Sequence, residues 1–299
     1  MILLALLGLA GCSRAVAEDE AALPTAAPTA APTLVAKAAT PTLAPTDPPA
    51  PTATPSPTPT RKYPPVAIDP GHGGEDLGAR RWQDGHMVHT EAQVNLDLGL
   101  RLRDQLEARG IPAYLTRDGD YALLDPRVDI NGSGDADYVD EAQARVDAIN
   151  ATDAAVMISL HQNAFEWPDG SLAPDVGGTV VYYCADRPFA EQSKRLADLV
   201  HEEIIGVFAE YGHDVRDRGV LDDAVLQEAG EPGGHLIVLG PESVHIVRPV
   251  QIPGVLSETL FITHEVEGAL AMDPVALDRF AQAYADAIQQ YLDETLAGD

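Results

Sequence analysis

The sequence predicts an α/β fold: a single domain with a mostly parallel, twisted sheet and helices on both faces. Two observations lead to this prediction. Short apolar runs alternate with longer amphipathic segments through residues 63–299, as expected for strands joined by helices. A segment of this length can also bury one hydrophobic core of good size.

The elements are predicted in the following order. Apolar runs predict strands at 66–68, 113–115, 155–160, 179–183 and 255–257. Helices are predicted at about 91–109, directly before the strand at 155–160, and at about 189–211 and 274–296. In the first of these helices, apolar residues recur every four positions, which predicts one buried face formed by Val94, Leu98, Leu102 and Leu106.

The first 62 residues differ in composition from the rest of the chain. Residues 1–12 are apolar but too short to span a bilayer, and they resemble the hydrophobic region of a signal peptide. They end in Leu9-Ala10-Gly11-Cys12, which resembles the lipobox of bacterial lipoproteins, so we expect lipidation at Cys12. Residues 13–62 are expected to be a disordered tether, because Ala, Pro and Thr make up 33 of the residues from 21 to 60.

Charge and cysteine content exclude several classes of protein. The net charge of −28 lies on residues 65–299, which hold 15 basic and 43 acidic residues, so we expect no nucleic-acid binding. Two cysteines are too few for a disulfide scaffold. Cys184 ends a predicted strand and is expected to be a buried, inert thiol.

Polar side chains follow three of the predicted strands. His72 comes soon after the strand at 66–68, while His161 and Glu258 come directly after those at 155–160 and 255–257. The carboxyl ends of strands form the functional crevice of an open α/β sheet, so we expect these side chains to lie close together. Two histidines and a carboxylate there indicate a metal site.

A third ligand is suggested by Glu91, which precedes Val94 by three positions on the apolar face of the first helix. A buried carboxylate needs a partner or a metal, and two His with one Glu form a common catalytic zinc set that keeps one position open. Glu258 would then be free to act as a general base. Two alternatives stay open: Glu91 as a charge complementing the helix dipole, and His86 or His89 as competing ligands.

Taken together, these motifs resemble the zinc-dependent N-acetylmuramoyl-L-alanine amidases of bacterial cell walls (Amidase_3 type). The resemblance covers nearly all of residues 65–296. It rests on Ile68-Asp69-Pro70-Gly71-His72-Gly73-Gly74 followed by Asp76, Gly78 and Ala79; Glu91-Ala92-Gln93-Val94-Asn95-Leu96; Leu115-Thr116-Arg117-Asp118; Arg145 to Asn150; Ser159-Leu160-His161-Gln162-Asn163-Ala164; Arg216-Asp217-Arg218-Gly219-Val220; and Val255-Leu256-Ser257-Glu258-Thr259-Leu260-Phe261.

The resemblance implies a hydrolase that cleaves the amide between N-acetylmuramic acid and L-alanine in peptidoglycan. It implies zinc ligands at His72, Glu91 and His161 and a catalytic Glu258, while Asp69 and Asn163 are expected to orient the ligands. We expect a monomer outside the cytoplasm that acts in the cell wall and touches the membrane only through its N-terminal lipid. The alternatives are another zinc amidohydrolase or peptidase, and a catalytically silent wall-binding lipoprotein.

Two segments depart from the family pattern. Residues from about 125 to 141 resemble a calcium loop, with oxygen-bearing side chains and Gly134 at suitable spacing. The expected calcium residues are Asp129, Asn131, Ser133, Asp135, Asp137 and Asp140. The alternative is an acidic turn that caps the following helix. The second segment, 221–253, is expected either to line or cover the cleft or to form a surface loop and hairpin.

Overall fold

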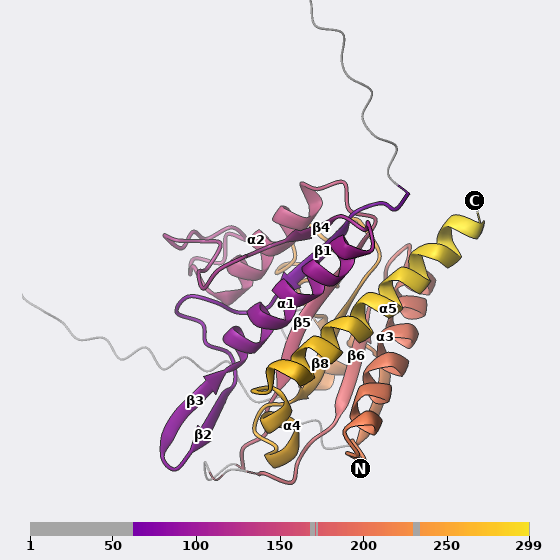
Figure 1. Cartoon of the computed structure of the whole chain (residues 1–299). Helices are drawn as coiled ribbons and strands as arrows, with labels where there is room; N and C mark the ends of the chain where they lie inside the picture. The colour runs from indigo at the N-terminus through magenta and orange to yellow at the C-terminus, as the bar shows by residue number, and fades with distance from the viewer. Residues whose placement is uncertain (1–61, 168–170, 172, 230–233, 299) are drawn as a thin grey trace, which may run out of the picture. The chain divides into compact units, whose positions relative to one another are not determined.

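A six-stranded sheet runs through the centre of the computed structural model, which describes residues 62–167, 171, 173–229 and 234–298 (Figure 1). Its strands lie in the order β4, β1, β5, β8, β6, β7. Their bounds are β1 Val66–Pro70, β4 Ala113–Leu115, β5 Val156–Asn163, β6 Thr179–Tyr183, β7 Asp217–Asp222 and β8 Gly254–Phe261. Neighbouring strands are parallel except for β6 and β8. The predicted mostly parallel sheet is confirmed.

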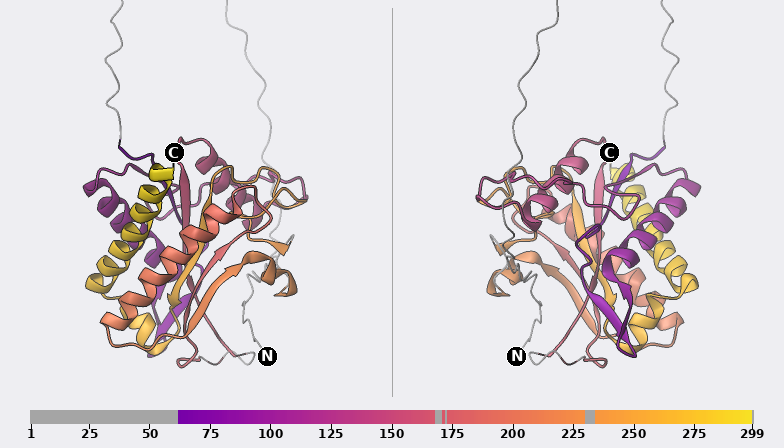
Figure 2. Two further views of the ribbon diagram at one scale, coloured as in Figure 1. Left: turned by 90° about the vertical axis from the view of Figure 1, so that its right-hand side faces the viewer. Right: turned by 90° about the vertical axis from the view of Figure 1, so that its left-hand side faces the viewer.

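Helices cover both faces of this sheet, as predicted (Figure 2). One face carries α1 (Glu91–Ala108), α3 (Ala190–Glu210) and α5 (Pro274–Gly298), and the other carries α2 (Tyr138–Asn150). A large apolar cluster lies between the sheet and helices α1, α3 and α5, and a smaller cluster lies between the sheet and α2. The sheet therefore separates two cores, and its strand ends are held from both sides.

Helix α1 begins where its sequence provides a cap. The hydroxyl of Thr90 accepts a hydrogen bond from the Gln93 amide, and the Gln93 side chain accepts one from the Thr90 amide. Such a capping box satisfies amides that have no partner inside the helix. The predicted stripe of Val94, Leu98, Leu102 and Leu106 is buried in the core. Glu91, the first residue of the helix, is consequently placed at the buried end of that stripe.

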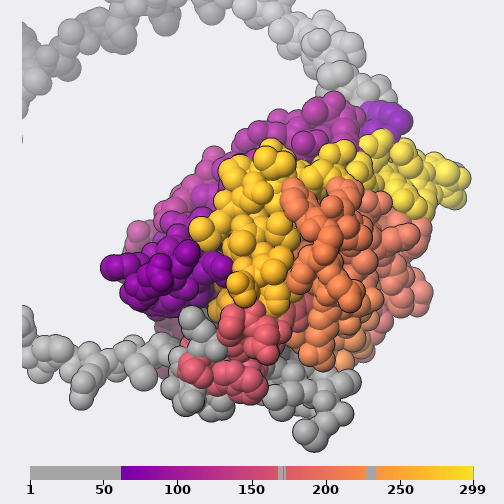
Figure 3. All heavy atoms as spheres, turned by 60° about the horizontal axis from the view of Figure 1, so that its bottom comes forward, coloured from indigo at the N-terminus to yellow at the C-terminus, as the bar shows by residue number. Residues whose placement is uncertain are grey.

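Five further elements are not among those predicted from the sequence, and two of them are the edge strand β7 and the 3₁₀ helix η1 (Asp223–Ala229). An antiparallel hairpin of β2 (Arg80–Gln83) and β3 (His86–Thr90) leads into α1, and a short helix α4 (Glu265–Leu270) follows β8. Most hairpin residues are exposed, so they lack the apolar run that identifies a buried strand. The purple hairpin projects from one side of the domain in Figure 3.

The segment from 221 to 253 forms no hairpin in its described part. It contains the end of β7, the 3₁₀ helix η1 (Asp223–Ala229) and irregular chain from 234 onward. Leu226, Val238, Leu239 and Val250 are buried in the apolar cluster under α2. The segment thus completes the second core, and the expectation of a surface loop and hairpin was wrong.

The N-terminal predictions fall outside the described residues. This applies to the signal peptide at 1–12, to Cys12 and to all of the tether at 13–62 except Lys62. In the part of the chain that is described, no helix combines the length and apolarity needed to cross a membrane.

Candidate metal centre

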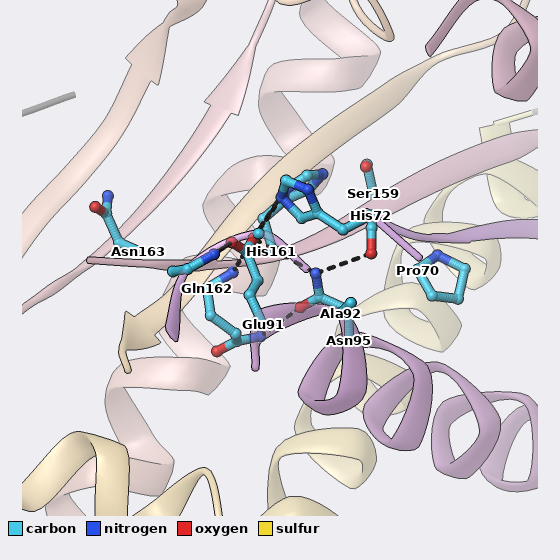
Figure 4. A network of polar contacts seen from close by, with 12 residues as sticks. Pro70, His72, Glu91, Ala92, Asn95, Ser159, His161, Gln162 and Asn163 are labelled. Atoms are coloured by element: carbon cyan, nitrogen blue, oxygen red, sulfur yellow. Dashed lines mark hydrogen bonds and ion pairs between the residues drawn. The ribbon is translucent and has the colours of Figure 1, made fainter. Parts of the chain in front are cut away.

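The three predicted ligands converge at one edge of the sheet (Figure 4). His72 Nε2 lies 3.1 Å from Glu91 Oε1, and His161 Nδ1 lies 3.0 Å from the same oxygen. The centroids of the two imidazole rings are 4.9 Å apart. One atom from each residue lies within 4.8 Å of the others, so a single cation can contact all three.

The parallel strands bring these residues together from distant parts of the sequence. His72 lies in the turn after β1, His161 lies near the carboxyl end of the neighbouring β5, and Glu91 opens α1. The backbone of His72 has a φ of 62°, a left-handed conformation that costs a non-glycine residue free energy. The surrounding structure must therefore hold this turn in place.

Two buried arginines hold the turn. Arg145 of α2 donates to the carbonyls of Pro70 and His72, at 2.8 and 2.6 Å. Arg117, which is fully buried after β4, donates to the carbonyls of Pro70 and Gly71, at 2.8 and 2.9 Å. These contacts fix the main chain on both sides of the imidazole.

Asp69 acts through Arg145. Its carboxylate accepts hydrogen bonds from Arg145, Thr116 and Ser159, and thereby joins β1 to α2, to the chain after β4 and to β5. Burial alone would raise the pKa of Asp69, but Arg145 and the two hydroxyls outweigh it and hold the pKa below its usual range. Asp69 therefore acts on the backbone of the turn through Arg145. Among the described residues, no hydrogen bond joins Asp69 to the side chain of a predicted ligand.

Asp76, which is not among the predicted site residues, orients His72 directly. Its Oδ2 lies 2.7 Å from His72 Nδ1, and its other oxygen accepts from the Gly78 amide. A carboxylate at Nδ1 fixes the proton there and leaves the lone pair of Nε2 for a cation. The pair spans an irregular turn, where a spacing of four does not indicate contact as it would in a helix, so the sequence held no local signal for it.

Glu91 is held by main-chain and side-chain donors. The amides of Ala79 and Gln162 donate to its two carboxylate oxygens at 2.9 and 3.0 Å, and the side chain of Asn95 lies 3.5 Å from Oε1. Burial raises the pKa of Glu91, but His72 and His161 overcome this and lower the pKa well below its ordinary value. The carboxylate is therefore ionised and oriented, as a metal ligand must be.

Two glycines leave room for the cluster. A Cβ at Gly71 would lie 2.2 Å from His161 Nε2, and a Cβ at Gly78 would lie 2.6 Å from Glu91 Oε2. Gly78 also has a φ of 60°, where side chains are strained. The Gly-rich turn is thus required by the packing of the ligands.

Glu258 lies beside this cluster. It pairs in register with His161 on the neighbouring parallel strand, and its Oε2 is buried without a hydrogen-bond partner in the described structure. Burial and the charge of Glu91 raise the pKa of Glu258, against a smaller opposing effect of His72. A cation held by the three ligands would balance the negative charge of Glu258 when this buried carboxyl is ionised. The donor set therefore fits a divalent metal ion.

The remaining predicted residues lie elsewhere. The side-chain oxygen of Asn163 accepts from the Ala164 amide, and in Figure 4 the side chain points away from the cluster. Contacts to Glu91 come from Asn95 and Gln162 instead. His86 and His89 lie on β3, and neither belongs to the converging group found among the described residues.

The predicted calcium loop has its carboxylates bonded to backbone amides. Asp129 accepts from the amides of residues 132–134, while Asp140 accepts from those of residues 130, 131 and 137. Asp137 is the N-cap of α2, which begins at Tyr138, and it forms a capping box with Asp140. The capping alternative is therefore realised, and calcium binding stays a prediction.

A second histidine pair, His213 and His264, surrounds the buried Glu267. Both oxygens of Glu267 accept from the Gly178 amide, and Oε2 also accepts from the Phe261 amide. His264 Nδ1 accepts from the Glu267 amide as the N-cap of α4. Glu267 and His264 are thus engaged with the main chain, and His213 Nε2 lies 3.3 Å from Glu267 Oε1, so we assign this group a structural role.

Fold and site together define an α/β protein with a candidate hydrolytic metal centre at the carboxyl ends of its strands. The chain belongs to the N-acetylmuramoyl-L-alanine amidase family, whose model matches residues 66–290. The family resemblance inferred from the motifs is thereby confirmed.

Individual relatives agree with this assignment. The chain is 29% identical over 229 residues to the N-acetylmuramoyl-L-alanine amidase LytC of Bacillus subtilis, an alignment that covers 76% of this chain and 35% of LytC. It is 26% identical over 254 residues to the amidase AmiC of Neisseria meningitidis, covering 78% of this chain and 54% of AmiC. The chain thus spans between one third and just over half of these relatives.

Solved structures show the same fold. The CwlD amidase of Clostridioides difficile, determined in complex with the GerS lipoprotein, superposes with a TM-score of 0.56 at 25% identity. That match covers 77% of this chain and 98% of CwlD. The amidase AmiC2 of Nostoc punctiforme gives a TM-score of 0.54 at 27% identity, over 76% of this chain and 96% of AmiC2.

Proposed function

We propose that this protein hydrolyses the amide bond between N-acetylmuramic acid and L-alanine in peptidoglycan, using zinc held by His72, Glu91 and His161. The observation that carries the proposal is the convergence of these three side chains beside the unpartnered Oε2 of Glu258, in a member of the amidase family. Bound there, zinc would supply a Lewis acid for the scissile carbonyl and would lower the pKa of water.

Glu258 is proposed as the general base and acid. It accepts the proton of the attacking water and then delivers it to the amine of the departing L-alanine. Its buried, unpartnered oxygen keeps a lone pair available, and desolvation makes the carboxylate a stronger base. Pairing in register with His161 keeps it at the same edge of the sheet as the ligands.

The other residues of the centre are proposed to preorganise it. Asp76 fixes the tautomer of His72, and Arg145 and Arg117 hold the strained turn that carries the imidazole. Groups that are already held in position do not have to be ordered during the reaction, so reaching the transition state costs less free energy.

Product analysis tests the proposed reaction. Purified zinc-loaded protein is incubated with isolated peptidoglycan, and the soluble products are analysed by mass spectrometry. We expect intact stem peptides with a free L-alanine amine and glycan strands with a free lactyl carboxylate. Cleavage inside the peptide would instead indicate another zinc amidohydrolase or peptidase, and binding without release would indicate a silent wall-binding protein. Glu258→Gln serves as the inactive control.

We further propose an extracytoplasmic monomer, anchored to the cell membrane by a lipid on Cys12, that acts on peptidoglycan in the wall. This rests on the lipobox-like sequence Leu9–Cys12 and on the family assignment. The wild-type protein should partition with membranes and Cys12→Ser should not. Equal partitioning of the two would contradict the anchor, and light scattering checks the monomer.

A further inference from the structure

A second group of metal-ligand side chains lies at the other edge of the sheet. Cys184 directly follows β6, and Asp223 directly follows β7. These two strands are parallel to each other, with Tyr183 paired to Asp222, so their carboxyl ends adjoin. Because β6 runs antiparallel to β8, this end is opposite to the edge that carries Glu258.

The segment after η1 contributes a histidine to this group. His235 Nδ1 lies 2.8 Å from Asp223 Oδ1 and 3.5 Å from Cys184 Sγ. One ligand atom from each residue lies within 4.8 Å of the others. The thiol and Asp223 are buried, and on the far side of the ring Asp186 Oδ2 lies 3.5 Å from His235 Nε2.

We propose that Cys184, Asp223 and His235 form a second, structural zinc site, in which Asp186 orients the imidazole. Thiolate, imidazole and carboxylate are all zinc ligands, and together they favour zinc over calcium or magnesium. A carboxylate on the distal ring nitrogen is the usual partner of a zinc-binding histidine. The fourth position would be taken by water.

The geometry favours this assignment over a cysteine nucleophile. In a cysteine–histidine dyad, the thiol and the orienting carboxylate contact opposite ring nitrogens. Here Asp186 does face the opposite nitrogen, but it is exposed and lies 3.5 Å away. The buried Asp223 lies 2.8 Å from the same Nδ1 that Cys184 faces, as expected when three ligand atoms surround one point. Burial and the nearby Asp223 also raise the pKa of the thiol to about 12, which opposes nucleophilic reactivity without a cation.

A cation there would also balance buried charge. Among the described residues, the only ion pair of Asp223 is with His235, and its second oxygen accepts from the Leu236 amide. Zinc would link the ends of β6 and β7 to the segment that completes the second core.

Metal substitution tests this site independently of the proposed hydrolysis. In the full chain with Cys12→Ser, Cys184 is the only thiol. We expect two zinc equivalents per chain after reconstitution, one of which is lost in Cys184→Ser and the other in His161→Ala. Substitution with cobalt should give a thiolate-to-metal charge-transfer band in the near ultraviolet, absent from Cys184→Ser but retained in His161→Ala.

The cobalt spectrum of the unsubstituted site decides the matter even if Cys184→Ser fails to fold. Absence of the band, or a single zinc equivalent that only His161→Ala removes, would overturn the proposal. Asp223→Asn keeps the thiol and should weaken the band while the circular dichroism stays native. Wall hydrolysis should be lost in His161→Ala and retained in Cys184→Ser, so failure of one proposal is distinguishable from failure of the other.

Discussion

Arg145 connects Asp69 to the main chain of His72. One guanidinium nitrogen lies 2.9 Å from Asp69 Oδ1, and the other lies 2.6 Å from the carbonyl oxygen of His72. Both side chains are almost fully buried. The pair therefore couples the stability of the domain to the conformation of a proposed metal ligand.

Replacing Arg145 with methionine should destabilise the domain and weaken zinc binding. It leaves the buried Asp69 without its cation, which costs roughly 3–5 kcal/mol in the free energy of unfolding. Urea unfolding and zinc competition measure the two effects. Arg103→Met is the control, because Arg103 pairs with the exposed Asp104 and should change stability by less than about 1 kcal/mol. Equal losses in the two variants would contradict this account.

Acid should remove the contribution of Asp69. Its pKa in the folded state lies below the unfolded value of 3.8, so the ionised carboxylate stabilises the fold above that pH. The contribution is lost as the pH falls from the unfolded pKa through the folded one. The stability difference between the wild type and Asp69→Asn, measured by denaturant unfolding, should consequently shrink upon acidification. A difference independent of pH would contradict the assigned charge state.

Gly78→Ala should disrupt the metal centre as well as the fold. The added Cβ would lie 2.6 Å from Glu91 Oε2 and 2.8 Å from His72 Cδ2. Gly110→Ala is a matched control, because Gly110 also has a positive φ but no atom within 4 Å of the added Cβ. Both should lose about 1–2 kcal/mol of stability from backbone strain, but only Gly78→Ala should lose zinc affinity, measured by chelator competition.

Glu258→Gln should retain zinc and lose hydrolysis. Glutamine keeps the shape of the side chain but cannot carry the proton, and loss of general acid–base catalysis typically costs a factor of about 10²–10⁴. Turnover of peptidoglycan and metal content are measured on the same preparation. Hydrolysis at the wild-type rate would remove Glu258 from its proposed role.

Calcium binding to residues 129–140 would raise the melting temperature. At about one hundred times the dissociation constant, a bound ion adds roughly 2.7 kcal/mol to the free energy of unfolding. Calorimetry of zinc-loaded protein with added calcium measures this, with magnesium as the control. If calcium leaves the transition unchanged, Asp129 and Asp140 serve only as the backbone caps described above.

Several elements could be predicted because their signals are local. The stripe from Val94 to Leu106 identifies α1, and the buried runs before His161 and Glu258 identify β5 and β8. Parallel strands align their carboxyl ends, so the meeting of His72 with His161 follows from strand order. Glu91 was predicted to be a metal ligand because it places an ionisable group on the apolar face of the helix.

Other features depend on tertiary structure and leave little trace in the sequence. A buried strand has the same apolar pattern in either direction, so the antiparallel β6 could not be inferred from Thr179–Tyr183. The contact of Asp76 with His72 occurs with a left-handed backbone at His72. A histidine in the sequence does not indicate that conformation. The meeting of His235 with Cys184 likewise depends on how the 234–253 segment packs.

Strand β1 enters the sheet at the edge opposite to the metal centre. The chain passes from Tyr63, whose hydroxyl donates to Asp293 near the end of α5, through Val66 to His72 at the far end. The domain therefore has a polarity: residue 62 enters it at one pole, and the candidate metal centre lies at the other. A substrate can thus approach the candidate centre without passing the point where the chain enters the domain.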